Sequence, residues 1–223
     1  MDNYEHAFPV IKKYGVPATI FLVTDLVGQS HLFWWDEIFQ IIQQKGHGVN
    51  SGNILKYAYR ASQINNFLMN KKESEINDFV DNFKKQSCIN RKMIPNQMLG
   101  WREIKEMAAV GISFGSHTKT HGNLCLMEDN EIRSELMGSK LVLEEKLGIK
   151  RIGFCYPFGK HDNKIEGIVK DAGFDYARTC IKGSNDKNTD RFSLRSIDAS
   201  FISNKTLFAS TVTFYSLRHW GGQ

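Results

Sequence analysis

The sequence predicts an α/β fold in which parallel strands alternate with helices. From residue 98 onward, short β-branched and aromatic segments alternate with segments of helical periodicity, and the connections between them are short. Polar residues, proline or glycine also follow or end several predicted strands, which is where α/β folds gather their ligands. Periodicity alone leaves open whether these strands form an open sheet or close into a barrel.

Length and composition are those of an ordinary globular domain. The chain has 223 residues, of which 41% are hydrophobic and 24% are charged, so it can bury a core without disulfides. Its formal charge of +5 comes from 29 basic and 24 acidic residues, and no run of like charge exceeds two residues. The four cysteines show no CxxC spacing. This composition favours neither a nucleic-acid partner nor a zinc knuckle or disulfide framework.

No segment of the sequence has the length and hydrophobicity of a membrane span. The longest strongly apolar run near the start, residues 18–23, is far too short. The chain opens on the polar stretch "MDNYEH", which is not a signal peptide. We therefore expect no membrane segment in this chain and a cytoplasmic location, and the sequence does not indicate an oligomeric state.

The first half of the chain combines one strand with several helical segments. Its pattern predicts, in order, a helix over 4–14, a buried strand over 17–24, a helix over 32–46, a weak hairpin-like stretch around 48–59 and a helical segment over 62–86. The region 48–96 departs from the strand–helix alternation. We expect it to be a mainly helical insertion within a single domain that spans 1–223.

The second half alternates regularly. It predicts helix 98–110, strand 112–117, helix 129–147, strand 151–157, helix 163–172, strands 175–181 and 193–199, and a terminal helix from about 204. Gly148 and Gly173 are placed to end two of these helices, and Asp162 is placed to cap the start of another. Right-handed crossovers between such strands give a parallel sheet.

Two histidines stand four residues apart in "GSHTKTHGNL", residues 115–124, directly after a predicted strand. Imidazoles at this spacing can face the same side of a turn and hold one metal ion. A catalytic ion usually takes a third protein ligand and keeps a position open for water. His117 and His121 are therefore candidate metal ligands. "YPFG" (156–159) follows another predicted strand and "RSID" (195–198) lies within a third, which favours one shared site.

The sequence resembles the polysaccharide deacetylases of the NodB-homology family. The similar segments occur in the family's order and cover most of the chain outside 48–96: "GVPATIFLV" (15–23), "LGWREIKEMAAVGISFGSHTKTHGNL" (99–124), "FCYPFGKHD" (154–162), "KDAGFDYA" (170–177) and "FSLRSID" (192–198). The resemblance implies a distorted (β/α) barrel that removes N-acetyl groups from amino sugars with one divalent ion. Zinc is the ion we expect, and cobalt or nickel are alternatives.

The resemblance also implies roles for individual residues. His117 and His121 would bind the metal, and the backbone N–H of Phe158 would stabilise the oxyanion. Tyr156 and Pro157 would contact the substrate. Trp101 is either a sugar platform or a residue of the core or cleft wall. Cys155 stands where the family often has an arginine that orients the base, and Arg195 is a candidate for that orienting role.

The family's third metal ligand and catalytic base are two aspartates in a T-[FY]-D-D-G motif at the end of its first strand. That motif should precede a helix like the one predicted at 4–14, which would place it upstream of Met1. We therefore expect a barrel without its first strand and a chain that is impaired as written. A leader or anchor missing with the same segment would place the protein in the cell envelope.

Three functions are consistent with these residues. The first is a metal-dependent hydrolase that removes N-acetyl groups from an amino-sugar polymer or oligosaccharide, with an N-acetylated glycan as its partner. The second is a non-catalytic, deacetylase-like protein that binds a glycan or another partner. The third is a metal-dependent hydrolase of a non-sugar C–N amide bond. Activity on N-acetylated sugars distinguishes the first from the other two.

Overall fold

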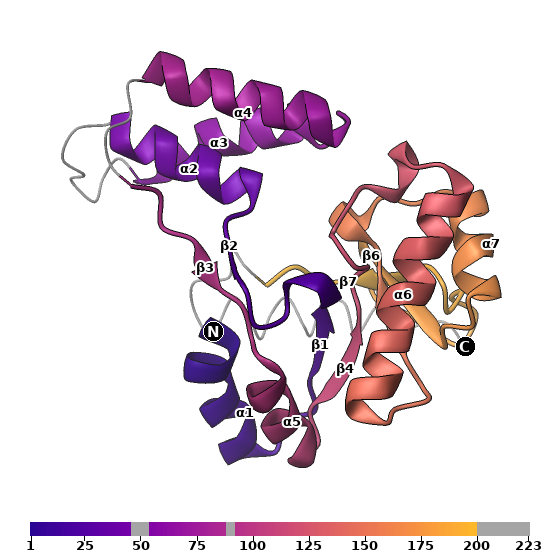
Figure 1. Cartoon of the computed structure of the whole chain (residues 1–223). Helices are drawn as coiled ribbons and strands as arrows, with labels where there is room; N and C mark the ends of the chain where they lie inside the picture. The colour runs from indigo at the N-terminus through magenta and orange to yellow at the C-terminus, as the bar shows by residue number, and fades with distance from the viewer. Residues whose placement is uncertain (46–53, 88–91, 200–223) are drawn as a thin grey trace. The chain divides into compact units, whose positions relative to one another are not determined.

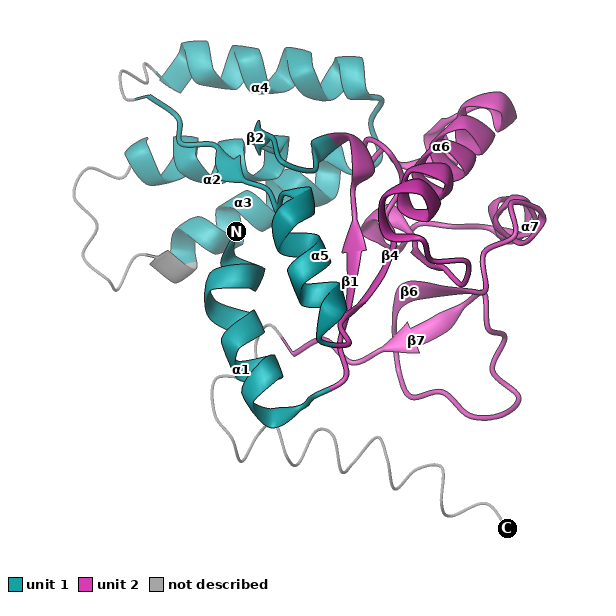
Figure 2. Ribbon diagram, turned by 60° about the horizontal axis from the view of Figure 1, so that its bottom comes forward, with its two compact units in different colours: residues 1–16, 26–110 teal, residues 17–25, 111–223 magenta. Residues whose placement is uncertain are grey.

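The computed structural model describes residues 1–45, 54–87 and 92–199. These residues form two compact units, shown in different colours in Figure 2. One unit contains Met1–Val16 and Leu26–Val110, and the other contains Pro17–Asp25 and the chain from Gly111 onward. The two units are described separately below. The expectation of a single domain over 1–223 stays a prediction.

The unit that begins at Pro17 is built on a parallel sheet. Its five strands are β1 (Thr19–Leu22), β4 (Ser113–Ser116), β5 (Gly153–Cys155), β6 (Tyr176–Lys182) and β7 (Leu194–Ser196), and they lie in the order β1-β4-β5-β6-β7. Figure 1 labels β1, β4, β6 and β7. Every neighbouring pair in this sheet is parallel. The predicted α/β class is therefore confirmed. The described strands form an open row, and closure into a barrel stays a prediction.

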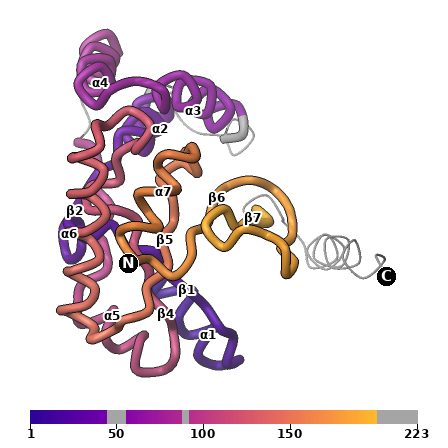
Figure 3. Tube along the Cα trace, turned by 90° about the vertical axis from the view of Figure 1, so that its right-hand side faces the viewer, coloured from indigo at the N-terminus to yellow at the C-terminus, as the bar shows by residue number. Residues whose placement is uncertain are grey.

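Two helices connect the strands of this sheet. Helix α6 (Asp129–Leu147) joins β4 to β5, and α7 (Asn163–Asp171) joins β5 to β6, a path that Figure 3 follows along the chain. As predicted, α6 ends at Gly148, which adopts the left-handed conformation with φ 66°. The side chain of Asp162 caps α7 by accepting the N–H of Ile165 at 2.8 Å.

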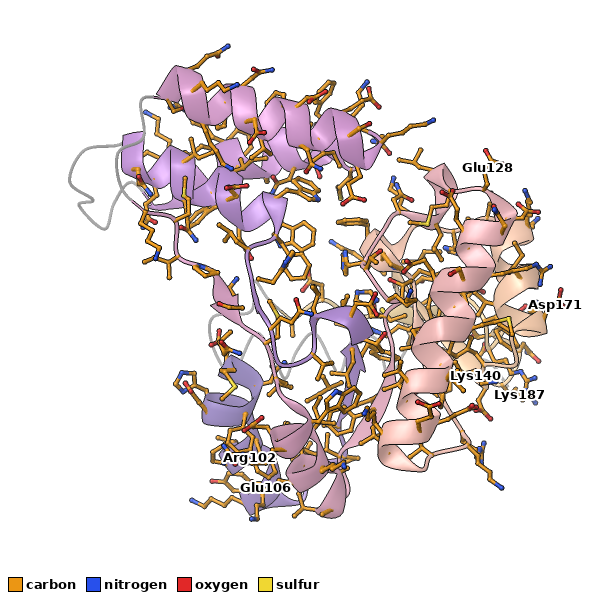
Figure 4. All side chains as sticks on the ribbon, viewed as in Figure 1. Arg102, Glu106, Glu128, Lys140, Asp171 and Lys187 are labelled. Carbon is orange, nitrogen blue, oxygen red and sulfur yellow. The ribbon has the colours of Figure 1, made fainter. Side chains whose placement is uncertain are left out.

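Helix α6 packs against β4 and α7. Lys140, on α6, donates its ammonium to the carbonyl oxygens of Ala172 and Gly173 at 2.9 and 2.7 Å, just beyond α7. Figure 4 labels Lys140 on α6 and Asp171, the last residue of α7. The free carbonyls at the end of α7 are thus satisfied by a cation from the neighbouring helix. This contact ties α6 to the turn that leads into β6.

The other unit is mainly helical. It contains a π-helical turn (Asn3–Ala7), α1 (Phe8–Tyr14), α2 (Trp34–Lys45), α3 (Ile54–Leu68), α4 (Glu73–Ser87) and α5 (Trp101–Ala109), with a short antiparallel pair β2 (Ser30–His31) and β3 (Asn96–Gln97). Helices α2, α3 and α4 enclose an apolar cluster of Ile38, Ile42, Tyr57, Ala61, Leu68, Ile76 and Val80. The described part of 48–96 is therefore mainly helical, as predicted.

One local prediction in this region is wrong, because residues 54–59 belong to α3 and not to a hairpin. The segment predicted to be helical over 62–86 is helical, and it comprises the second half of α3 and most of α4 with a break at 69–72. At this break the N–H of Lys72 donates to Oε2 of Glu75 at 3.0 Å, so the chain begins a new capped helix. The rest of the hairpin-like stretch and the terminal helix predicted from 204 fall outside the described residues.

Among the described residues, no helix combines the length and the apolar character needed to cross a lipid bilayer.

Candidate active site

The two predicted metal ligands lie just beyond β4, at the carboxyl end of the sheet. His117 directly follows Ser116, the last residue of β4. Its N–H donates to the carbonyl oxygen of Leu22 at 2.8 Å, and Thr24 N–H donates to the carbonyl oxygen of Thr118 at 3.2 Å. These bonds extend the β1–β4 pairing past the strand ends. The loop 117–121 is therefore held against the extension of β1.

The structure brings His117 and His121 together. Their ring centroids are 4.6 Å apart and the ring planes are nearly perpendicular, at 86°. Two imidazoles this close can present nitrogen atoms to one ion. The geometry agrees with the spacing argument, and metal binding itself stays a prediction.

A backbone carbonyl determines which nitrogen of His117 carries the proton. Nδ1 lies 2.6 Å from the carbonyl oxygen of Cys155, the last residue of β5. Because a carbonyl oxygen only accepts hydrogen bonds, Nδ1 must be the donor. In the neutral ring Nε2 then keeps its lone pair. Metal-binding histidines are commonly oriented by such a bond from the other ring nitrogen.

Burial keeps both imidazoles neutral. Burial lowers the pKa of His117. The hydrogen bond to Cys155 opposes this shift, and the charge of Arg178 makes a smaller contribution that also lowers the pKa. Burial lowers the pKa of His121 to about 3, and the neighbouring charge of His117 adds to this effect. Only the neutral form of histidine binds a metal. Both side chains are therefore in the form that a metal requires at neutral pH.

Backbone strain is concentrated at this site. Among the described residues, three that are not glycine have positive φ: Thr118 (69°), His121 (70°) and Phe158 (57°). Such conformations cost on the order of 1–3 kcal/mol each and persist only where surrounding contacts enforce them. One such contact is the hydrogen bond from His121 N–H to Thr118 Oγ1, at 2.9 Å. Strain of this kind is common at functional sites.

Phe158 belongs to the 3₁₀ turn Pro157–Gly159 that follows β5. Its ring meets the ring of His121 edge to face, with centroids 4.8 Å apart. The next residue, Gly159, has φ 68°, and a Cβ there would lie 2.6 Å from Cβ of Cys180 on β6. The turn is thus packed tightly between the loop after β4 and strand β6. The oxyanion role of the Phe158 N–H stays a prediction.

Tyr156 and Pro157 are both buried. The Tyr156 hydroxyl donates to the carbonyl oxygen of Phe192 at 3.0 Å, and its ring stacks on His161 with centroids 4.6 Å apart. In this structure these side chains support the turn from inside the unit, and their contact with a substrate stays a prediction.

The two remaining candidates belong to different units. Arg195 is on β7 and exposed, and its backbone N–H donates to Oδ1 of Asn185 at 2.8 Å. Trp101 is the first residue of α5, in the other unit, and is partly exposed. The orienting role of Arg195 and the substrate role of Trp101 stay predictions.

Two residues near the histidines were not predicted from the sequence. Arg178, on β6, is in register with Cys155 and its charge acts on His117. Glu135 is buried on α6 and binds the loop between the histidines. The sequence contains a signal for Glu135, because this carboxylate lies between Ile132 and Leu136 on the apolar face of a predicted helix. The position of Arg178 had no such signal, because it depends on strand order.

The described ranges contain no group of three or more His, Cys, Asp or Glu side chains that could hold a metal. The candidate metal ligands at this site are the two imidazole nitrogen donors of His117 and His121. This donor set fits part of a zinc-type site, and the described residues add no carboxylate to it.

The comparison with family models identifies the class of protein. The polysaccharide deacetylase model matches residues 1–177, and the chain belongs to this family. The resemblance inferred from the motifs is thus confirmed.

Individual relatives agree with this assignment. The chain is 30% identical over 92 residues to the putative polysaccharide deacetylase YxkH of Bacillus subtilis (strain 168), a match that covers 40% of this chain and 31% of that protein. The structure is similar to the Streptococcus pyogenes deacetylase PplD in complex with acetate (TM-score 0.55, 19% identity, 88% of this chain and 58% of that chain). It is also similar to IcaB from Ammonifex degensii (TM-score 0.58, 19% identity, 96% and 68%). These two structural likenesses show the fold alone.

Proposed function

We propose that this protein removes N-acetyl groups from an amino-sugar polymer or oligosaccharide, with a divalent metal held by His117 and His121. The observation that carries this proposal is the pair of imidazoles with ring centroids 4.6 Å apart, one of which is oriented by the carbonyl oxygen of Cys155. Membership of the polysaccharide deacetylase family supports the reaction class. The matches cover 31% of YxkH and 58% of PplD.

Zinc suits two imidazole donors, and cobalt and nickel bind the same ligand type. Bound here, such an ion would polarise the amide carbonyl and lower the pKa of a water molecule. The side chains have separate tasks. His117 and His121 supply the two nitrogen donors, and the Phe158 ring lies edge to face against the His121 ring. The Phe158 N–H is our candidate donor to the developing oxyanion.

We propose that activity is weak. Among the described residues the metal would have two protein ligands, and no third His, Cys, Asp or Glu joins them. A catalytic ion usually takes three protein ligands, so an ion held by two should bind less tightly and the rate should be lower.

The direct test is acetate release from N-acetylglucosamine oligomers with added Zn²⁺ or Co²⁺. His117→Gln and His121→Gln should each abolish the metal-dependent part of the activity, and a chelator should do the same to the unmodified protein. His6→Gln replaces an exposed histidine and is the matched control. Activity that is insensitive to chelator and to both substitutions would refute the mechanism. Glycan binding without acetate release would favour the non-catalytic alternative.

A further inference from the structure

Glu135 is a carboxylate on the buried face of α6. The same helix also buries the apolar residues Ile132, Leu136 and Leu143, and Glu135 itself is 9% exposed. Burying a carboxylate is unfavourable unless donors satisfy its oxygens. In the described part of the chain no cation pairs with Glu135, and the nearby ammonium of Lys119 pairs with Asp25 at 3.7 Å. The donors to Glu135 must therefore come from elsewhere.

The donors to Glu135 come from the loop between the two histidines. Oε2 of Glu135 accepts the N–H of Lys119 at 2.8 Å and the N–H of Thr120 at 2.9 Å. Oε1 accepts the hydroxyl of Thr120 at 3.1 Å. Lys119 and Thr120 lie directly between Thr118 and His121, whose backbones have positive φ. Hydrogen bonds to a charged acceptor are about twice as strong as neutral ones, so this carboxylate is suited to enforce a strained loop.

The opposite edge of the same loop is held by backbone. Thr24 N–H donates to the carbonyl oxygen of Thr118 at 3.2 Å, and Asp25 N–H donates to that of Lys119 at 3.1 Å. The carbonyl groups of the loop are thus bound by the extension of β1, and its N–H groups are bound by Glu135. Loss of the carboxylate would leave two N–H groups without their acceptor and would let the strained residues relax.

A second contact from the same face of α6 supports the start of the loop. Ser139 lies one turn beyond Glu135, and its hydroxyl oxygen is 2.7 Å from that of Ser116. Ser116 Oγ in turn accepts the N–H of Thr118 at 3.2 Å. Helix α6 therefore contacts the loop at the residue before His117 and at the two residues before His121.

We propose that Glu135 is a positioning residue that holds the loop 117–121 in the conformation in which both imidazoles can bind one metal ion. The proposal rests on the metal site of the proposed function. It predicts that Glu135 affects metal affinity through the loop, without itself contacting the ion.

Three variants of the full chain separate the contributions. Glu135→Gln keeps one oxygen that can accept both N–H groups, whereas Glu135→Leu removes every acceptor at similar volume. Glu145→Gln is the matched control, because Glu145 is an exposed glutamate on the same helix. Two measurements are made on each: Co²⁺ affinity from the visible absorption of the bound ion, and amide hydrogen exchange of Lys119 and Thr120 without metal.

Glu135→Leu should weaken Co²⁺ affinity by about 10–100-fold, the range found when a group that orients a metal ligand is removed. It should also speed exchange at Lys119 and Thr120 selectively. Glu135→Gln should restore most of both properties, and Glu145→Gln should match the unmodified protein. A general loss of stability would speed amide exchange along the whole chain. Rescue by Glu135→Gln, with exchange elsewhere unchanged, therefore indicates a specific effect on the loop.

Unchanged Co²⁺ affinity and unchanged loop exchange in a folded Glu135→Leu protein would overturn the proposal. Uniformly faster exchange along the chain would also overturn it, in favour of a purely structural role. If Glu135→Leu does not fold, Thr120→Val removes only the hydroxyl donor and should weaken Co²⁺ binding less, with exchange raised at Thr120. If the unmodified protein binds no Co²⁺, the proposed function fails, and the exchange data still test whether Glu135 holds the loop.

Discussion

The imidazole of His117 donates its Nδ1–H to the carbonyl oxygen of Cys155 over 2.6 Å, and this bond joins the loop after β4 to the end of β5. The two residues are 38 positions apart in the sequence. Adjacent parallel strands bring them together, because their carboxyl ends share one edge of the sheet. The bond orients the ring and leaves Nε2 as the nitrogen available to an ion.

Metal binding should depend on both imidazoles. Replacing His117 with Gln removes a nitrogen donor, so the affinity for Co²⁺ should fall by more than the ~10–100-fold typical of losing an orienting partner. Isothermal titration of the chelator-treated protein measures this change. His6→Gln, at an exposed position, should leave the affinity unchanged. Equal affinities for His117→Gln and the unmodified protein would place the metal elsewhere.

The metal-free protein should lose stability as the pH falls. The pKa of His121 is about 3 in the folded state against 6.5 for an ordinary histidine, so only the unfolded chain takes up the proton between these values. This contribution is fully present above about pH 6.5 and is lost as pH falls towards 3. Between pH 7 and pH 5 the loss from this residue should be about 2 kcal/mol.

Urea unfolding with chelator present, at both pH values, measures that loss. His121→Gln cannot take up a proton and should show a smaller decrease in the free energy of unfolding than the unmodified protein. An identical decrease in the two proteins would show that His121 is not buried in its neutral form.

The turn after β5 should not tolerate a side chain at Gly159. Gly159→Ala places a Cβ 2.6 Å from Cβ of Cys180 and 2.8 Å from its backbone nitrogen, at a φ of 68°. The strain should lower the free energy of unfolding by about 1–3 kcal/mol. Gly167→Ala is the control, because a Cβ there meets nothing within 4 Å inside α7. That substitution should stabilise the protein by about 0.5–1 kcal/mol, as alanine does inside a helix. Thermal unfolding distinguishes the two signs.

The core under α6 should be sensitive to cavities. Leu136 is fully buried, and Leu136→Ala should lower the free energy of unfolding by about 2–5 kcal/mol. Its neighbour Met137 is 60% exposed, and Met137→Ala should change stability by no more than about 0.5 kcal/mol. Chemical denaturation of both variants tests the orientation of α6. Similar losses in the two variants would show that the helix is rotated relative to the structure.

The sequence by itself determined the class of fold and the position of the histidine pair. Helix α6 and its end at Gly148, the cap of α7 by Asp162, and the placement of His117 after a strand all follow from short-range patterns. Such patterns are readable because helix periodicity, caps and stop residues act within a few positions along the chain. The family motifs likewise lie in short contiguous segments.

Only the tertiary structure decided how the site is supported. The bond from His117 to Cys155, the contacts of Glu135 with Lys119 and Thr120, and the pairing of Cys155 with Arg178 join residues about 15 to 38 positions apart. The burial of Tyr156 and the strained φ of His121 depend on the same packing. No local pattern encodes these features, because each arises from the order of strands and the face that a helix turns toward the sheet.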